Sequence, residues 1–200
     1  MRPAAIGFRV KSGWAAAVLL GGPVASPVVL DSRNILLSDP DEPASRQPYH
    51  AGTGSGQTDA ARIKKLTDVV QRSARRSVAD LVKDYRCGGT DLRGAALVVG
   101  SDVDPARIAN PHIRAHASEG RLFCTALEEA LARCELARTV VVERGIFAQA
   151  SQTLGRAEPE LKAAVTTLGR AVAGGWRAEQ KTAALGAWTL LASGPRGGHL

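Results

Sequence analysis

The densest group of chemically active side chains lies in residues 110–121, Asn-Pro-His-Ile-Arg-Ala-His-Ala-Ser-Glu-Gly-Arg. The Asn-Pro pair is typical of a helix start, because Asn caps the first turn and proline fits the first helical position. On such a helix His112, His116 and Glu119 stand at i, i+4 and i+7 and share one face. Two imidazoles and a carboxylate at this spacing can bind zinc, manganese or iron, but no further ligand can be named from the sequence. The group can instead be an acid–base pair, or a polar helix start that hydrogen-bonds to loops.

Acidic residues follow the apolar run Ala95–Gly100, which has the composition of a buried strand. Ligands gather beyond the carboxyl ends of parallel strands, so Asp102 and Asp104 are candidates to lie near the His-containing helix start. Asp residues before a proline can equally shape a loop by bonding to their own backbone. One hypothesis is therefore a metal-assisted phosphoester hydrolase with the catalytic residues Asp102, His112, His116 and Glu119, and with Glu143 and Glu179 as further candidates.

Basic side chains offer a second kind of site. Arg114 and Arg121 are separated by about two helical turns and can clamp a phosphate or a carboxylate bidentately. With 26 Lys and Arg against 19 Asp and Glu, the net charge of +7 permits a polyanionic partner through counterion release. The alternative is surface charge that faces water, since aromatic residues for base stacking make up only 4% of the chain. The candidate nucleic-acid-binding residues are Arg9, Lys11, Arg114, Arg121 and Lys181.

Hydrophobic spacing indicates which elements position these residues. Short apolar runs separated by Gly-containing turns predict an antiparallel meander at the start of the chain, and later segments alternate between helix and strand. We therefore predict an α/β fold with a mixed five-stranded sheet, in which residues 1–192 form a single domain and residues 193–200 a flexible tail. The predicted elements are strands at 4–10, 14–20 and 28–37, a helix from Thr58 or Asp59 to about 86, a strand at 95–100, a helix at 110–134, a strand at 139–142, and helices at 147–154, 159–173 and 178–192. His50 lies in the loop at 38–57, and the sequence assigns it no role.

This order of elements resembles the ribonuclease H-like fold, and the last third of the chain is similar to RuvC-type Holliday junction resolvases. The opening hairpin Ile6–Ala15 resembles the first strand and turn of that family. Phe147–Gly155, Pro159–Leu168 and Glu179–Trp188 resemble its short helix, its helical pair and its Ala-rich last helix. The resemblance implies nucleic-acid chemistry in which clustered carboxylates hold two metal ions on a phosphodiester.

The sequence departs from that family at the positions where carboxylates are expected. The first-strand Asp of the family is replaced by Arg9, and the end of the fourth strand reads Gly100-Ser101 with Asp102 next. The last helix offers Glu179, followed by Gln180, Lys181 and Thr182, in place of paired Asp. An Arg at the centre of a metal site would repel the cations, so Mg²⁺ or Mn²⁺ is expected as a cofactor only if a nuclease site survives.

The leading prediction is a ribonuclease H-like protein with a degenerate metal site that binds nucleic acid or another polyanion without two-metal cleavage. The hydrolase described above is one alternative. A non-catalytic structural or assembly protein is another, in which the helix at 58–86 is an interface and the chain can form a homo-oligomer. No apolar run approaches the roughly 20 residues that span a bilayer, which predicts no membrane partner. The three cysteines, Cys87, Cys124 and Cys134, lack zinc-site spacing and are expected to be reduced thiols in a cytoplasmic protein.

Overall fold

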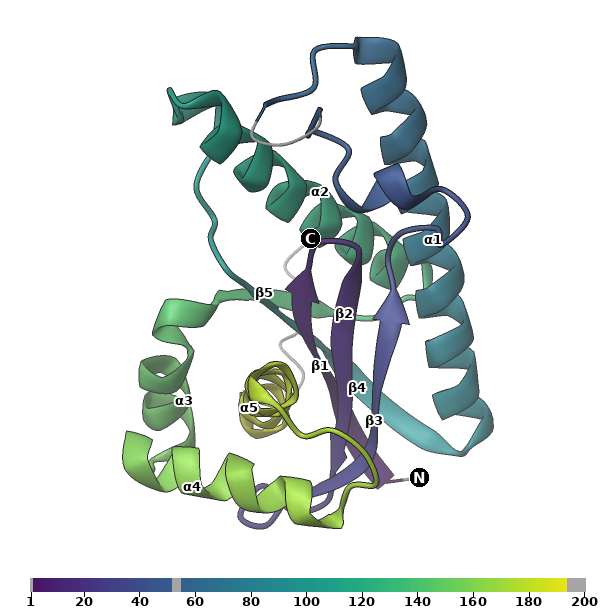
Figure 1. The fold of residues 1–200 in the computed structure, drawn as a ribbon. Coiled ribbons are helices and arrows are strands. Elements are labelled where there is room, and N and C mark those ends of the chain that lie inside the picture. Colours follow the sequence, from purple (N-terminus) through teal and green to yellow (C-terminus); the bar gives the residue numbers. More distant parts are fainter. Residues whose placement is uncertain (1, 52–54, 194–200) are drawn as a thin grey trace.

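The structure is a computed structural model that describes residues 2–51 and 55–193. Within these residues, one mixed sheet has the strand order β3-β2-β1-β4-β5 (Figure 1). β1, β2 and β3 are antiparallel neighbours, whereas β4 runs parallel to β1 and β5 runs parallel to β4. The predicted α/β fold with a mixed five-stranded sheet is confirmed. The strands are β1 (Arg2–Lys11), β2 (Trp14–Gly21), β3 (Val28–Leu36), β4 (Thr90–Val99) and β5 (Arg138–Val142).

Helices cover both faces of this sheet. The long helices α1 (Ala60–Cys87) and α2 (Pro111–Arg133) pack against one face. On the other face α5 (Ala178–Ser193) lies directly on the strands, with α3 (Ile146–Leu154) and α4 (Glu158–Leu168) beside it (Figure 1). Short 3-10 turns occur at Pro43–Arg46, Pro105–Arg107, Glu143–Gly145 and Gly169–Ala171.

The central strands are apolar on both sides because both faces are covered. Along β1, Ile6 and Phe8 join the core under α1 and α2, and the alternation of a strand turns Ala5 and Arg9 toward α5. Arg9 is therefore a charged residue placed inside a layered core, and it is only 5% exposed.

Two helix starts confirm the capping signals of the sequence. The Asp59 side chain accepts hydrogen bonds from the backbone amides of Ala61 and Arg62, and it starts α1. The Asn110 side chain does the same for the first turn of α2, where Pro111 follows it. The start of α2 thus holds the first turn of the His-containing segment in a fixed position.

The predicted helix at 159–173 is shorter in the structure, where α4 ends at Leu168. The Trp176 indole folds back over the end of the helix, and its Nε1 donates to the Val165 carbonyl at 2.7 Å. A Cβ on Gly169 would lie 2.1 Å from Trp176 Cδ1, so the glycine makes room for the ring. The local spacing of apolar residues carries no information about this long-range contact.

None of the helices in the described ranges is both long and apolar enough to cross a lipid bilayer. The tail predicted for residues 193–200 lies outside the described residues, apart from Ser193 itself.

The packing of α5 on β1 depends on a missing side chain. A Cβ built on Gly7 would lie 1.8 Å from the backbone carbonyl oxygen of Ala183 and 2.9 Å from the amide nitrogen of Ala187. Because these are backbone atoms in the middle of a helix, no rotamer change can relieve the clash.

We expect Gly7→Ala to displace α5 and to lower the free energy of unfolding by about 3 kcal/mol or more, at the upper end of overpacking costs. Gly120→Ala on α2 is the matched control, because nothing lies within 4 Å of its added Cβ. That variant should gain about 0.5–1 kcal/mol from helix propensity. Urea denaturation measures both, and equal stabilities for the two variants would contradict the packing argument.

Candidate functional site

A cleft of about 970 Å³ opens beyond the carboxyl ends of β1 and β4, where the sequence predicts a binding site. α2 forms one wall and the loop after β4 forms another. Besides Asp104, the cleft collects five of the nine predicted catalytic and nucleic-acid-binding residues, whereas His112, Arg114, Glu119 and Lys181 do not line it. Those five are Arg9, Lys11, Asp102, His116 and Arg121.

At the strand end, Arg9 forms a bidentate ion pair with Glu143, the first residue after β5. Arg9 Nε donates to Glu143 Oε1 at 3.0 Å, and Nη2 donates to Oε2. The third nitrogen, Nη1, donates to the Val10 carbonyl at 2.7 Å. The Arg9 side chain is 6% exposed and that of Glu143 is 42% exposed, so the cation is the buried partner.

A second cation of β1 pairs with the last helix. Lys11 Nζ lies 3.6 Å from Glu179 Oε1 in the first turn of α5. The carboxylates of Glu143 and Glu179, both proposed from the sequence as site residues, therefore each face a cation of β1. The sequence did not reveal these pairings, because Arg9 and Glu143 are 134 positions apart.

The predicted basic residues of α2 contact the loop that precedes the helix. Arg114 Nε donates to the Ile108 carbonyl at 2.8 Å, and its Nη2 donates to the Ala109 carbonyl at 3.0 Å. Arg121 Nη1 lies 3.2 Å from Asp104 Oδ1 in an exposed pair at the cleft. Arg121 thus faces the cleft, whereas Arg114 anchors the loop beside it.

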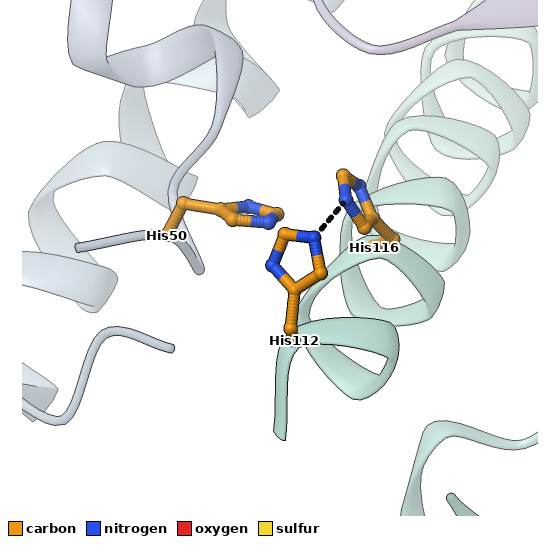
Figure 2. Close-up of side chains that lie close together, drawn as sticks. All are labelled: His50, His112 and His116. Carbon is orange, nitrogen blue, oxygen red and sulfur yellow. Dashed lines mark hydrogen bonds between the residues drawn. The ribbon is translucent and has the colours of Figure 1, made fainter. Parts of the chain in front are cut away.

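A second group of side chains lies around the first turns of α2. His112 and His116 come from the helix, and His50 reaches them from the segment between β3 and α1 (Figure 2). One nitrogen from each imidazole lies within 4.8 Å of the others. The Nε2 atoms of His112 and His116 are 3.2 Å apart.

Glu119, the predicted third member of the helix face, lies behind these rings and is completely buried. Its Oε1 lies 2.7 Å from Nδ1 of His50, and its Oε2 lies 4.0 Å from Nδ1 of His116. Burial raises the pKa of Glu119, and the hydrogen bond with His50 opposes that shift. The half-buried Tyr49 is also affected, because burial and the nearby Glu119 charge raise the pKa of its phenol.

The sequence placed His112, His116 and Glu119 on one face correctly but did not identify His50. A bridge between His50 and Gly56, with the Gln57 amide donating to the Tyr49 carbonyl at 2.8 Å, holds His50 in place. His50 and Glu119 are 69 positions apart, so helix spacing could not connect them. The one feature of the sequence that could have pointed to His50 is that histidine is rare in this chain, which has only four. Asp102, the other predicted catalytic residue, lines the cleft and is not part of this group.

No protein-family model matches the sequence, and no curated protein matches it. Solved structures do match: Thermus thermophilus RuvC superposes with a TM-score of 0.55 at 12% identity, covering 93% of this chain and 92% of that one. T. thermophilus RuvC in complex with a Holliday junction substrate gives the same TM-score and identity, covering 93% of this chain and 90% of that one. The fold is ribonuclease H-like. The resemblance that the sequence carried is thereby confirmed at the level of the fold.

In this ribonuclease H-like fold the cleft lies at the carboxyl ends of the parallel strands β1 and β4. The Arg9–Glu143 and Lys11–Glu179 pairs lie at these strand ends. His116 lines the cleft and is also a member of the histidine group, whereas His50 and His112 do not line the cleft. Lys181 lies in the first turn of α5, is partly exposed, and stands outside both groups.

We expect Glu143→Gln to lower the free energy of unfolding by about 1–3 kcal/mol, because it leaves the buried Arg9 guanidinium without a charged partner. Glu42→Gln is the control, since Glu42 pairs with the exposed Lys65 at 3.1 Å and such pairs contribute about 0–1 kcal/mol. Chemical denaturation of both variants measures the difference. A loss for Glu143→Gln no greater than that of the control would show that Arg9 does not need this partner.

The thiols provide a separate prediction. Burial, together with the neighbouring Glu128, raises the pKa of Cys124 to about 12, so very little thiolate exists near neutral pH. Cys87 is exposed. A thiol reagent at pH 8 should therefore modify Cys87 at least 100-fold faster than Cys124, as followed by mass spectrometry, and Cys124 should gain reactivity only as the pH rises toward 12. Rapid labelling of Cys124 at pH 8 would contradict this assignment.

Proposed function

We propose that this chain binds nucleic acid in the cleft at its strand ends and does so without two-metal phosphodiester cleavage. The observation that carries the proposal is the ion pair between the buried Arg9 guanidinium and Glu143 at the carboxyl end of β1. One of the similar structures is T. thermophilus RuvC in complex with a Holliday junction substrate, and for this reason we choose nucleic acid as the ligand class.

The residues at the strand end do not fit a pair of divalent cations. Two-metal cleavage needs several carboxylates whose oxygens are available to the ions. Here Glu143 uses both oxygens on the Arg9 guanidinium, and Glu179 faces Lys11. A buried guanidinium is permanently charged and repels divalent cations beside it, which disfavours two-metal chemistry at Glu143 and Glu179.

The same residues favour an anionic ligand. Lys11 and Arg121 stand at the cleft with exposed side chains, and each has only one carboxylate partner among the described residues. The net charge of +7 adds a long-range attraction for a phosphate backbone. A phosphate can compete with Asp104 for Arg121, because exposed ion pairs of this kind are weak.

A second candidate function, metal-assisted phosphoester hydrolysis away from the strand end, is favoured by one observation. His50 joins His112 and His116 and so completes a set of three imidazoles, which the sequence alone did not provide. This alternative requires that the set holds a metal ion, which is a separate question from binding in the cleft.

We expect labelled four-way junction, duplex and single-stranded DNA to bind with steep salt dependence and to remain uncut in Mg²⁺ or Mn²⁺. The Arg121→Glu variant, and the double variant with Lys11→Glu, should lower affinity at least tenfold, because both side chains line the cleft. Each should also reduce the slope of log K against log salt by about 1 for every phosphate that the protein no longer neutralises. Titration by fluorescence anisotropy at several salt concentrations, followed by denaturing gels, measures both properties.

Arg76→Glu is the matched control, because it makes the same change in charge on the exposed face of α1. An equal loss of affinity in the control would indicate non-specific attraction, and it would overturn the assignment of the cleft. Metal-dependent cleavage would contradict the proposed absence of two-metal chemistry. A defined oligomer that binds none of these DNAs would instead support a structural or assembly role.

A further inference from the structure

We propose that His50, His112 and His116 bind one Zn²⁺ ion and that Glu119 orients two of these ligands from behind. This site is distinct from the strand end of the ribonuclease H-like fold. It does not depend on nucleic-acid binding, and its ligands are imidazole nitrogens instead of carboxylate oxygens.

The distances between the rings fit ligands that share one ion. Zinc–imidazole bonds of 2.0–2.1 Å in a tetrahedral arrangement place two nitrogens roughly 3.3 Å apart. The Nε2 atoms of His112 and His116 are 3.2 Å apart, and one nitrogen from each of the three rings lies within 4.8 Å of the others. Figure 2 shows the three rings converging from two separate segments of the chain.

The contact with Glu119 determines which nitrogen of His50 is free to bind a metal ion. An ionised Glu119 carboxylate can only accept a hydrogen bond, so Nδ1 of a neutral His50 ring carries the proton and Nε2 carries the lone pair. Nδ1 of His116 lies 4.0 Å from the other oxygen of the same carboxylate, and its Nε2 lies on the opposite side of the ring, beside His112. Histidine ligands of metals almost always donate their second nitrogen to a carboxylate, a carbonyl or water, as His50 does to Glu119.

Several buried polar atoms of the histidine group have no hydrogen-bond partner among the described residues. These atoms are His50 Nε2, His112 Nδ1 and Glu119 Oε2. Leaving a buried acceptor without a partner costs about 1–3 kcal/mol, so an isolated cluster of this kind is unfavourable. An ion that binds Nε2 of His50 would satisfy one of these atoms and would draw the other two rings toward the same point.

The ligand set and its exposure indicate the type of site. Three neutral imidazoles without a thiolate suit Zn²⁺, and three protein ligands leave a fourth position for water or a ligand oxygen. The His50 side chain is 7% exposed, whereas that of His116 is 52% exposed and lines the cleft. The site is therefore open to solvent on the side where His116 lies, next to the cleft.

The test uses untagged protein that has been stripped with a chelator and then titrated with ZnCl₂ by calorimetry. We expect one ion per chain, and X-ray absorption of the loaded protein should show three nitrogen ligands at 2.0–2.1 Å. Cobalt substitution should give the intense visible bands of a low-coordinate site. Zinc should also raise the melting temperature, because it binds only the folded arrangement.

His116→Asn changes the half-exposed ligand and preserves the core, and it should weaken Zn²⁺ binding at least 100-fold, as should His50→Asn. Glu119→Gln should weaken it about 10–100-fold, since the carboxylate acts through its hydrogen bond to His50 and its charge near His116. Glu129→Gln is the matched control, being the same chemical change on an exposed carboxylate of the same helix, and it should retain full affinity.

Absence of stoichiometric zinc binding by the wild-type protein would overturn the proposal. So would binding that survives both His116→Asn and His50→Asn. These readouts contain no nucleic acid, so they are independent of the test of the cleft, and either proposal can fail without the other.

Discussion

The buried guanidinium of Arg9 is the constraint on which the arrangement at the carboxyl ends of the parallel strands depends. Arg9 lies on the central strand β1 and turns its side chain toward the face that α5 covers, where a cation without a carboxylate would be strongly unfavourable. Its fork reaches across the end of β4 to Glu143 at the end of β5, and Nη1 lies 3.5 Å from the Val98 carbonyl of β4. One side chain therefore links the ends of three parallel strands. The same ion pair places a permanent positive charge at these strand ends, which disfavours divalent cations there.

Helix α2 connects the strand-end cleft to the histidine group. One of its sides carries Arg121 and faces the cleft, while Glu119 is turned into the interior behind the imidazoles. His116 is the shared member, because it lines the cleft and lies 3.2 Å from His112 through their Nε2 atoms. The cap at Asn110 fixes the start of the helix, and so it helps to position His112 and His116 in its first turns.

The features that the sequence predicted are those set by local spacing. The strands, the starts of α1 and α2, and the shared face of His112, His116 and Glu119 follow from periodicity and capping, and the structure bears them out. The features that it missed join distant segments. The partner of Arg9 is 134 positions away, and His50 is 69 positions from Glu119. Such pairs depend on the register of a sheet and the path of a loop, which hydrophobic periodicity does not encode.

The two groups also differ in the chemistry that their charges allow. A centre for Mg²⁺ needs several anionic oxygens, and at the strand end the carboxylates of Glu143 and Glu179 face the cations Arg9 and Lys11. Neutral imidazoles need no such charge balance, and the single carboxylate behind them is engaged with His50 and not with a cation of β1. Arg9 and Lys11 therefore disfavour oxygen-ligated ions beside these two carboxylates, and neither cation is part of the nitrogen site on α2. The proposed anion site and the proposed metal site therefore use different groups of side chains within the same fold.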